Sequence, residues 1–565
     1  MNEQQVFTSN PQLRGKPSSA EVNVQQIFAT SSMTRLKKTL QAARTKVACM
    51  KIGNNRSALQ ESEIDFLGKQ LVECCLTHMQ DSYRIHLSRV KGLRILHTMV
   101  VLATVDQIET ELAMHMVWAA LSCIHHFLLR LKSKGGLMQW VRRRQARKSI
   151  KIYDKLLKFL APKQYSLIFT SVVTFLEEAS LWDIEYFCSN LLQRVLVHGE
   201  DRDRPESIME IISLAETNTI TNTITSRQIL KVLLDIGEID KWSWLNNRLL
   251  DRILDMYYAS ITPEESHDYN YESLEKILEE CLSAMSFHLS EKQQVFVMSW
   301  MLDAVMEESI PHDNIMKFGN VLEHVAALYT RKLARRPLSE HVLPAVLKVI
   351  SSKNLLFSLL GHRILQNLID RSNNKVKFNT PRVFLRSSHY NLVVNQYRHS
   401  DKLLFQRYRE TIHQTTIASV LTHGISMVYI EHIYLSIALF LVEIPCAYTA
   451  AAGACLSMAL QDAALMNGSM SMEHSNRIHA TVISLMSLIC YIHKACVFYD
   501  YVEKILDKRS DFAPHLNPPL QIQYRYARHH LLWNEPHMFF EPWETRYGLW
   551  RCFRTTKDVV VMMVE

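Results

Sequence analysis

The chain has 565 residues, with only 14 glycines, 15 prolines and a formal net charge of +8 at pH 7. So few turn-forming residues in so long a chain predict long helices joined by short connections, rather than one ordinary globular core. The charge is too modest to set a partner by itself, and the eleven scattered cysteines favour reduced, buried thiols in a cytosolic protein over a disulfide framework.

Along the chain, residues 1–32 are polar and contain no apolar run, so we expect a disordered segment that is neither a secretory signal nor a membrane anchor. Helical periodicity then predicts N-terminal repeats over residues 33–160 and further helical repeats over 161–517. Residues 518–565 are rich in Trp, Tyr, Phe and His without helical spacing, and we interpret them as an aromatic-rich C-terminal tail.

Individual helices can be recognised within these repeats. Apolar residues from Leu274 to Met285 recur at a spacing of three to four and share one face. Thr262 to Glu265 and Ser290 to Gln293 have the pattern of N-terminal capping sequences. The most apolar region, residues 433–460, is split by Glu443 and Pro445 into stretches too short to span a bilayer, so it predicts two buried helices and no transmembrane span.

Stacked helices of this kind form solenoids, in which each unit contacts only its neighbours. The lengths of the segments between predicted breaks match armadillo and HEAT repeats, although no repeat consensus can be quoted. The predicted fold is therefore all-α: an armadillo/HEAT-like α-solenoid, built as a right-handed superhelix of helix pairs.

Catalytic motifs are absent from the sequence. After Gly424-Ile425-Ser426, Val428 stands where a nucleophile elbow needs its second glycine, and no phosphate-binding loop is present. His125 and His126 are adjacent, and His474 and His479 are five residues apart, so neither pair has the helical spacing of zinc ligands. We therefore expect no enzyme, no cofactor and no metal site.

One basic cluster stands out, and Asp154 is its only acid. A basic helix headed by an aromatic residue, here Trp140, is typical of a surface that binds an anionic membrane. A solvated helix face is the competing interpretation, and nucleic acid is a less favoured partner because no base-reading module accompanies the cluster. The candidate membrane-binding residues are Lys132, Lys134, Arg142, Arg143, Arg144, Arg147, Lys148, Lys151, Lys155 and Lys158.

Several stretches, taken in order, resemble the rolling-blackout or Eighty-five-requiring-three family of plasma-membrane scaffolds. They are MALQDAA at 458–464, His479-Ala480, RSDFAP at 509–514, LQNLIDRSNNKVKF at 365–378 and ASLWD at 179–183. The residues themselves also have simple structural interpretations. Gln461 and Asp462 would satisfy backbone groups at a contact between helices, Asp370 and Arg371 would form a surface pair, and Trp182 would be a packing anchor.

The resemblance implies a non-catalytic helical-repeat scaffold at the inner face of the plasma membrane. Such scaffolds recruit phosphatidylinositol 4-kinase type III alpha through its partner subunits and so support phosphoinositide synthesis. The chain departs from the family because its first cysteine is Cys49, so the N-terminal cysteine cluster is missing, and because the aromatic tail replaces the C-terminal region from about Pro518. Without its anchor the protein would be cytosolic. The alternative function is a soluble helical-repeat adaptor for an unrelated protein or a nucleic acid.

Overall fold

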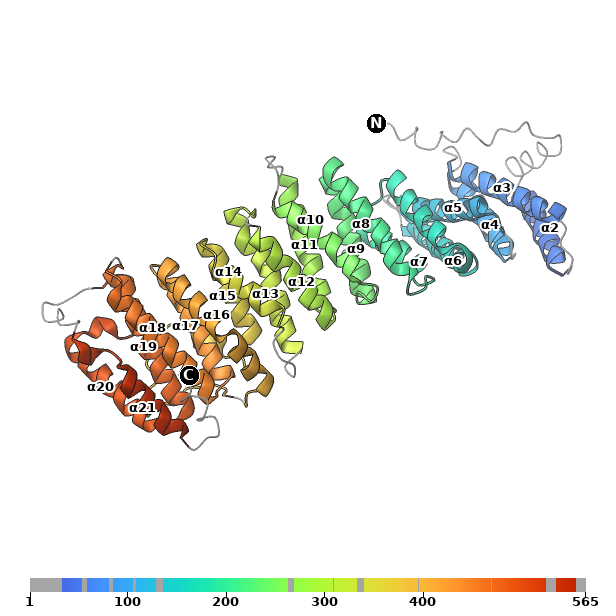
Figure 1. Cartoon of the computed structure of the whole chain (residues 1–565). Coiled ribbons are helices and arrows are strands. Elements are labelled where there is room, and N and C mark those ends of the chain that lie inside the picture. The colour runs from blue at the N-terminus through green and yellow to red at the C-terminus, as the bar shows by residue number, and fades with distance from the viewer. Residues whose placement is uncertain are drawn as a thin grey trace. The chain divides into compact units, whose positions relative to one another are not determined.

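The protein is an all-α solenoid of the armadillo type, which confirms the predicted fold class. In the computed structural model, the part of the chain that is described contains helices α2 to α21 and no strand (Figure 1). The described residues are 33–52, 58–80, 85–104, 108–128, 136–262, 269–307, 309–332, 340–394, 396–468, 470–524 and 535–554. The segment predicted over 1–32 lies outside these ranges, and so does most of the predicted cap at 262–265.

The chain divides into two compact units. Unit 1 comprises Met1–Ile253 with Asp268–Cys281, and unit 2 comprises Leu254–His267 with Leu282–Glu565. In unit 1, α3 packs on α4 and α5, α5 packs on α6, and α9 packs on α7 and α8. The helices that begin in unit 1 are α2 (Met33–Ile52), α3 (Ala58–Gln80), α4 (Ile85–Ala103), α5 (Thr110–Leu128), α6 (Gly136–Glu178), α7 (Glu185–Leu196), α8 (Asp203–Thr221), α9 (Thr223–Asp240), α10 (Asn247–Ile261) and α11 (Tyr269–Ser286).

The long helix α6 is interrupted near its middle. Pro162 lies inside it, and Gln164 has non-helical backbone angles of φ −141° and ψ 40°. Proline removes a backbone donor and crowds the preceding turn, so the helix bends here. The Gln164 side chain donates to the Ile108 carbonyl oxygen at 3.1 Å and so ties the bend to the start of α5. The boundary predicted at residue 160 therefore falls inside α6, just before its bend.

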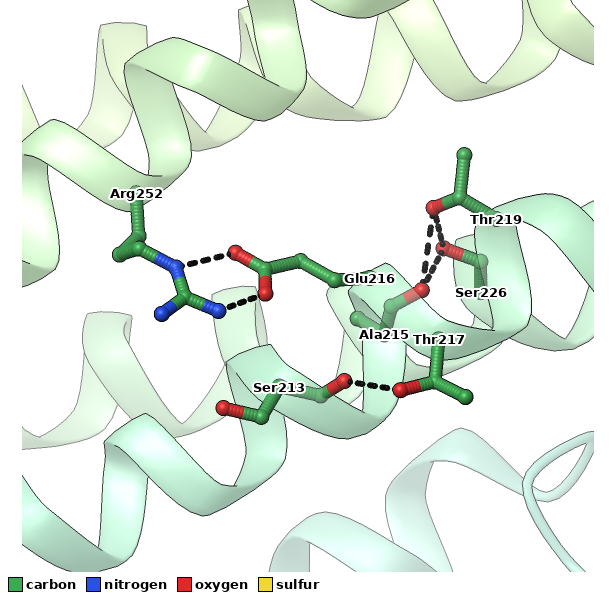
Figure 2. A network of polar contacts seen from close by, with 7 residues as sticks. All are labelled: Ser213, Ala215, Glu216, Thr217, Thr219, Ser226 and Arg252. Atoms are coloured by element: carbon green, nitrogen blue, oxygen red, sulfur yellow. Dashed lines mark hydrogen bonds and ion pairs between the residues drawn. The ribbon is translucent and has the colours of Figure 1, made fainter.

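Polar contacts join α8 to α9 and α10 at the edge of the apolar core of unit 1. Figure 2 shows that two nitrogens of Arg252 of α10 donate to the Glu216 carboxylate of α8, and Nε lies 2.6 Å from one carboxylate oxygen. Ser226 of α9 donates to the Ala215 carbonyl oxygen at 2.8 Å and also contacts the Thr219 hydroxyl. These contacts fix the order of neighbouring helices in addition to the apolar contacts between them.

Unit 2 contains the remaining helices. In this unit α13 packs on α12 and α15, α17 packs on α15 and α19, and α18 packs on α16, α19 and α21. The α-helices are α12 (Glu291–Met306), α13 (Ile315–Lys332), α14 (Val342–Ile350), α15 (Leu355–Ile369), α16 (His399–His423), α17 (Met427–Glu443), α18 (Ala447–Met466), α19 (Met472–His493), α20 (Cys496–Phe512) and α21 (Pro542–Phe553). Short 3-10 turns are η2 (His312–Asn314), η3 (Lys375–Lys377), η4 (Pro514–Leu516) and η6 (Pro536–Met538).

The clearest sequence patterns give the helices they predicted. On α11 the apolar face from Leu274 to Met285 is buried. The Ser290 capping sequence starts α12, where the Ser290 backbone N–H donates to Gln293 Oε1 at 2.9 Å. The apolar region at 433–460 forms α17 and α18, two helices with buried faces, and the chain turns at Pro445 between them. Among the described residues, no helix combines the length and the apolar composition needed to cross a membrane.

The segment after residue 518 differs from the prediction, because part of it is a helix packed on α18 and α20. α21 has Pro542 in its first turn, where proline is favoured. Its buried side includes Gly548, where an added Cβ would come within 2.7 Å of the Phe498 ring. The exposed side carries Trp543, Tyr547 and Trp550. Because large aromatic residues also lie on the exposed side of α21, apolar residues do not recur at a helical period in its sequence, and the helix could not be predicted from it.

Candidate functional site

The basic cluster on α6 forms one exposed face. Lys132 and Lys134 lie outside the described residues, and the side chain of Arg142 is likewise not described. Most of the small or apolar residues between the cations are buried, among them Ala146, Tyr153 and Leu157. Helical spacing therefore puts the cations opposite the core. We call the exposed residues the basic face: Arg143, Arg144, Arg147, Lys148, Lys151, Lys155 and Lys158.

Asp154, the only acid within this stretch, points to a partner on another helix. Its carboxylate accepts a hydrogen bond from Arg194 of α7, with 2.6 Å between Oδ1 and Nη1. This ion pair is half-buried, so it fixes Asp154 to α7. The carboxylate is therefore engaged by Arg194, a cation from outside the basic face.

Positive charge also reaches α2 and α4. Burial, together with the charges of Arg44 and Lys155, lowers the pKa of His97. Arg44 of α2 contacts His97 Nδ1 at 3.2 Å and donates to the Thr98 hydroxyl at 3.1 Å. His97 lies on α4, so the cations of α2 and α6 act on the same group between them.

Residues of the family-like stretches in unit 2 hold a segment that lies mostly within the predicted C-terminal tail. We call residues 514–524 and 535–541 the C-terminal strap. Gln461 of α18 accepts from the Phe540 backbone N–H and donates to the Phe540 carbonyl oxygen, both at 2.9 Å. Gln461 therefore satisfies backbone groups, as predicted, while Asp462 is exposed.

Arg509 of α20 is the centre of this attachment. Its side chain is fully buried, and it donates to the carbonyl oxygens of Met538 at 2.7 Å, Leu516 at 3.1 Å and His479 at 3.3 Å. Burial lowers the pKa of Arg509 to about 9, so the guanidinium still carries its proton at neutral pH. A planar guanidinium can serve three carbonyl oxygens at once, which explains arginine at the start of RSDFAP.

Arg477 of α19 has the same function further along the strap. It donates to the carbonyl oxygens of Ile522 at 2.8 Å and Gln521 at 3.2 Å, and to that of Ile425 at 2.6 Å. The Tyr501 hydroxyl accepts from the Glu541 backbone N–H at 2.8 Å. The role of Arg477 was not predicted. Its signal would have been an arginine within a helix whose residues from His474 to Cys490 are all buried.

The interpretation of Asp370 and Arg371 as a surface pair was wrong. Asp370 accepts from the backbone N–H groups of Asn374 at 2.7 Å and Lys375 at 3.1 Å, so it shapes the turn after α15. Arg371 instead binds Asp401 of α16 with two nitrogens, including a contact of 3.0 Å between Nη2 and Oδ1. Asp401 is only 4% exposed, so the carboxylate of this ion pair is buried, while Arg371 is half-buried. Trp182 is 2% exposed, which confirms its role in packing.

The histidines singled out in the sequence take separate positions. His125 and His126 stack on one another, with 5.6 Å between ring centroids, while His474 and His479 are buried in α19. Burial, assisted by the charge of Arg509, lowers the pKa of His479 well below its usual value. Within the described ranges, no group of three His, Cys, Asp or Glu side chains is placed to hold a metal ion.

Comparison with known proteins agrees with the solenoid fold. The family model described as EFR3, armadillo repeat, matches residues 54–532. The Drosophila melanogaster protein EFR3 homolog cmp44E is 21% identical over 363 residues, which are 62% of this chain and 42% of the relative. The chain thus spans less than half the length of that relative. Because the family match covers most of the chain, the resemblance inferred from MALQDAA and RSDFAP is confirmed, and the chain belongs to the EFR3 armadillo-repeat family.

Proposed function

We propose that this chain is a non-catalytic scaffold at the inner face of the plasma membrane, where it positions a phosphatidylinositol 4-kinase type III alpha complex. Family membership supports a helical-repeat scaffold. The kinase complex comes from the family resemblance, and the attachment to lipid comes from charge. The observation that carries the membrane part is the basic face of α6, whose cations are exposed on one side of a helix that is buried on the other.

An anionic leaflet attracts such a face without requiring a pocket. Each lysine or arginine near the surface contributes about 1 kcal/mol, and the attraction falls off within the Debye length, about 8 Å at physiological ionic strength. Asp154, the only acid in the sequence of this cluster, forms an ion pair with Arg194 of α7. Binding should therefore depend on salt and on the anionic lipid content of the membrane, as expected for a peripheral protein.

Flotation with liposomes tests the membrane part. The full chain should float with vesicles of phosphatidylcholine and phosphatidylserine at low salt, and less of it should float as salt is raised. Changing Lys148, Lys151, Lys155 and Lys158 to glutamine should strongly reduce the floated fraction. The expected loss is large because four contributions of about 1 kcal/mol act on one equilibrium.

The matched control removes the same net charge elsewhere. Lys276, Lys292, Lys504 and Lys508 are exposed lysines on α11, α12 and α20, and changing them to glutamine should leave flotation nearly unchanged. Equal losses in the two variants would mean that overall charge, and not the basic face, drives binding. Absence of flotation at every salt concentration would remove the membrane part and favour the soluble adaptor.

The kinase part needs a separate measurement. The full chain should co-purify with the subunits of the kinase complex, and so should both glutamine variants. Only the basic-face variant should lower the fraction of kinase at the plasma membrane, because membrane attachment raises the local concentration of whatever the scaffold binds. If no kinase subunit co-purifies with any of the three proteins, the partner is different and the adaptor function is favoured.

A further inference from the structure

Unit 2 contains a cavity of about 580 Å³ that none of the contacts above uses. It is lined by side chains of α14, α15, α16, α17 and α18 and is partly open to solvent. Its volume lies within the roughly 300–1,000 Å³ typical of small-molecule sites, so it suits a small ligand better than a folded partner.

One wall of the cavity is apolar. It is formed mainly by Ile433, Ile437 and Phe440 of α17 and by Leu456 of α18, together with Leu365 of α15. All five side chains are otherwise buried in the protein core. A wall of this kind removes apolar ligand surface from water, at about 25 cal/mol for each Å² buried.

The polar wall of the cavity comes mainly from α16. Lys402, Gln406, Arg409, His413 and Thr416 line the cavity at spacings of three to four residues, so they lie on one side of the helix. α16 also contributes Phe405 and Ile412 to the lining, and the centroid of the Phe405 ring lies 5.0 Å from that of the Phe440 ring. The two walls are therefore suited to different parts of one ligand.

Charge at the polar wall indicates which ligand end belongs there. Lys402 and Arg409 carry positive charge, and Glu410 is the only acidic residue among the described residues that line the cavity. Carboxylate and phosphate oxygens match these cations. A headgroup with a quaternary ammonium alone would not.

We propose that this cavity binds a single-chain lipid with an anionic headgroup, with its acyl chain against α17 and α18 and its carboxylate or phosphate against α16. The proposal does not rest on the function proposed for the basic face, because that face belongs to unit 1 and the cavity to unit 2. A lipid in the cavity would fill the space between α16 and α17 and stabilise unit 2 by mass action.

A cysteine at the cavity provides the readout. Cys455 of α18 lines the cavity and is exposed, while Cys496 of α20 is also exposed but does not line the cavity. The full chain is treated with iodoacetamide, and the alkylation of each cysteine is followed by peptide mass spectrometry. Oleoyl lysophosphatidic acid, below the concentration at which it aggregates, should slow the alkylation of Cys455 several-fold and leave that of Cys496 unchanged.

Two further lipids test which headgroup the cavity binds. Oleate carries a carboxylate in place of the phosphate of lysophosphatidic acid. Protection of Cys455 by only one of these two anionic lipids would identify the headgroup that the cavity prefers, and would still agree with the proposal. Monoolein has the same chain without the charge and should protect much less. Equal protection by monoolein would overturn the assignment of an anionic headgroup.

Variants distinguish the cavity from general lipid adsorption. Ala452→Leu places a larger side chain in the cavity and should abolish protection of Cys455. Ala459→Leu is the matched control, because Ala459 lies two turns further along α18 and does not line the cavity. Lys402→Gln with Arg409→Gln leaves the apolar wall intact and should weaken protection by the anionic lipids only. Unchanged alkylation of Cys455 with every lipid, or equal protection in Ala452→Leu and Ala459→Leu, would overturn the proposal.

Discussion

Changing Arg509 to methionine is expected to lower the free energy of unfolding of unit 2 by at least about 3 kcal/mol and to release the C-terminal strap. The guanidinium is fully buried and donates to three carbonyl oxygens, two of them in the strap, at Met538 and Leu516. Methionine fills much of the same space but donates to none of them. Buried carbonyl groups left without a donor cost about 1–3 kcal/mol each, so the loss exceeds that of an ordinary surface contact.

The measurement combines urea unfolding with limited proteolysis of the folded protein. The variant should be cut within the strap under conditions that leave the parent chain intact, since a released segment is accessible to a protease. Lys508→Met is the control, because Lys508 precedes Arg509 on α20 and is exposed. Arg509→Lys keeps the charge without the planar fork and should give an intermediate loss. A proteolysis pattern for Arg509→Met that matches the control would show that the strap does not depend on this arginine.

Removing the carboxylate of Asp401 is the second change with a large expected effect. Asp401→Ala leaves the Arg371 guanidinium without the partner that it binds through two nitrogens. The Asp401 side chain is only 5% exposed and that of Arg371 is 21% exposed. Breaking a buried pair by removing one partner costs about 3–5 kcal/mol, because the remaining charge stays in a poorly solvated position. The free energy of unfolding from urea titration should fall by an amount of this order.

An exposed ion pair in the same unit gives the comparison. Arg407 and Glu340 are 2.7 Å apart, with both side chains 62% exposed, so Glu340→Ala should cost only about 0.2–1 kcal/mol. The double change Arg371→Met and Asp401→Leu should recover much of the loss, since no unpaired charge remains. If Asp401→Ala proved as mild as Glu340→Ala, the pair between the turn after α15 and helix α16 would have to be accessible to water.

Sequence patterns predicted the helices best where apolar residues follow one clear period. The buried face of α11 and the two helices separated at Pro445 could be recognised from their sequences alone. The basic face could also be recognised, because its residues are close together in the chain. The structure adds that Asp154 turns toward Arg194 on α7.

Contacts between distant parts of the chain could not be predicted in this way. Arg371 and Asp401 are separated by the irregular segment between α15 and α16, and no local spacing relates them. The cavity has the same limitation, since it depends on five helices and on which side of α16 faces α17. The strap was missed for another reason. It is attached through backbone carbonyl groups, which every residue has, so no pattern in the sequence of the strap predicts the contact.

This mode of attachment has a consequence for how the strap can change over evolution. Gln521 and Ile522 are held by Arg477 through their carbonyl oxygens, while their side chains project into solvent. Mutations at these two sites can therefore accumulate without disturbing the path of the chain. The sequences of homologous proteins could diverge there until they no longer align, while the strap keeps the same path. This requires only that the arginines that donate to its backbone carbonyl oxygens are retained.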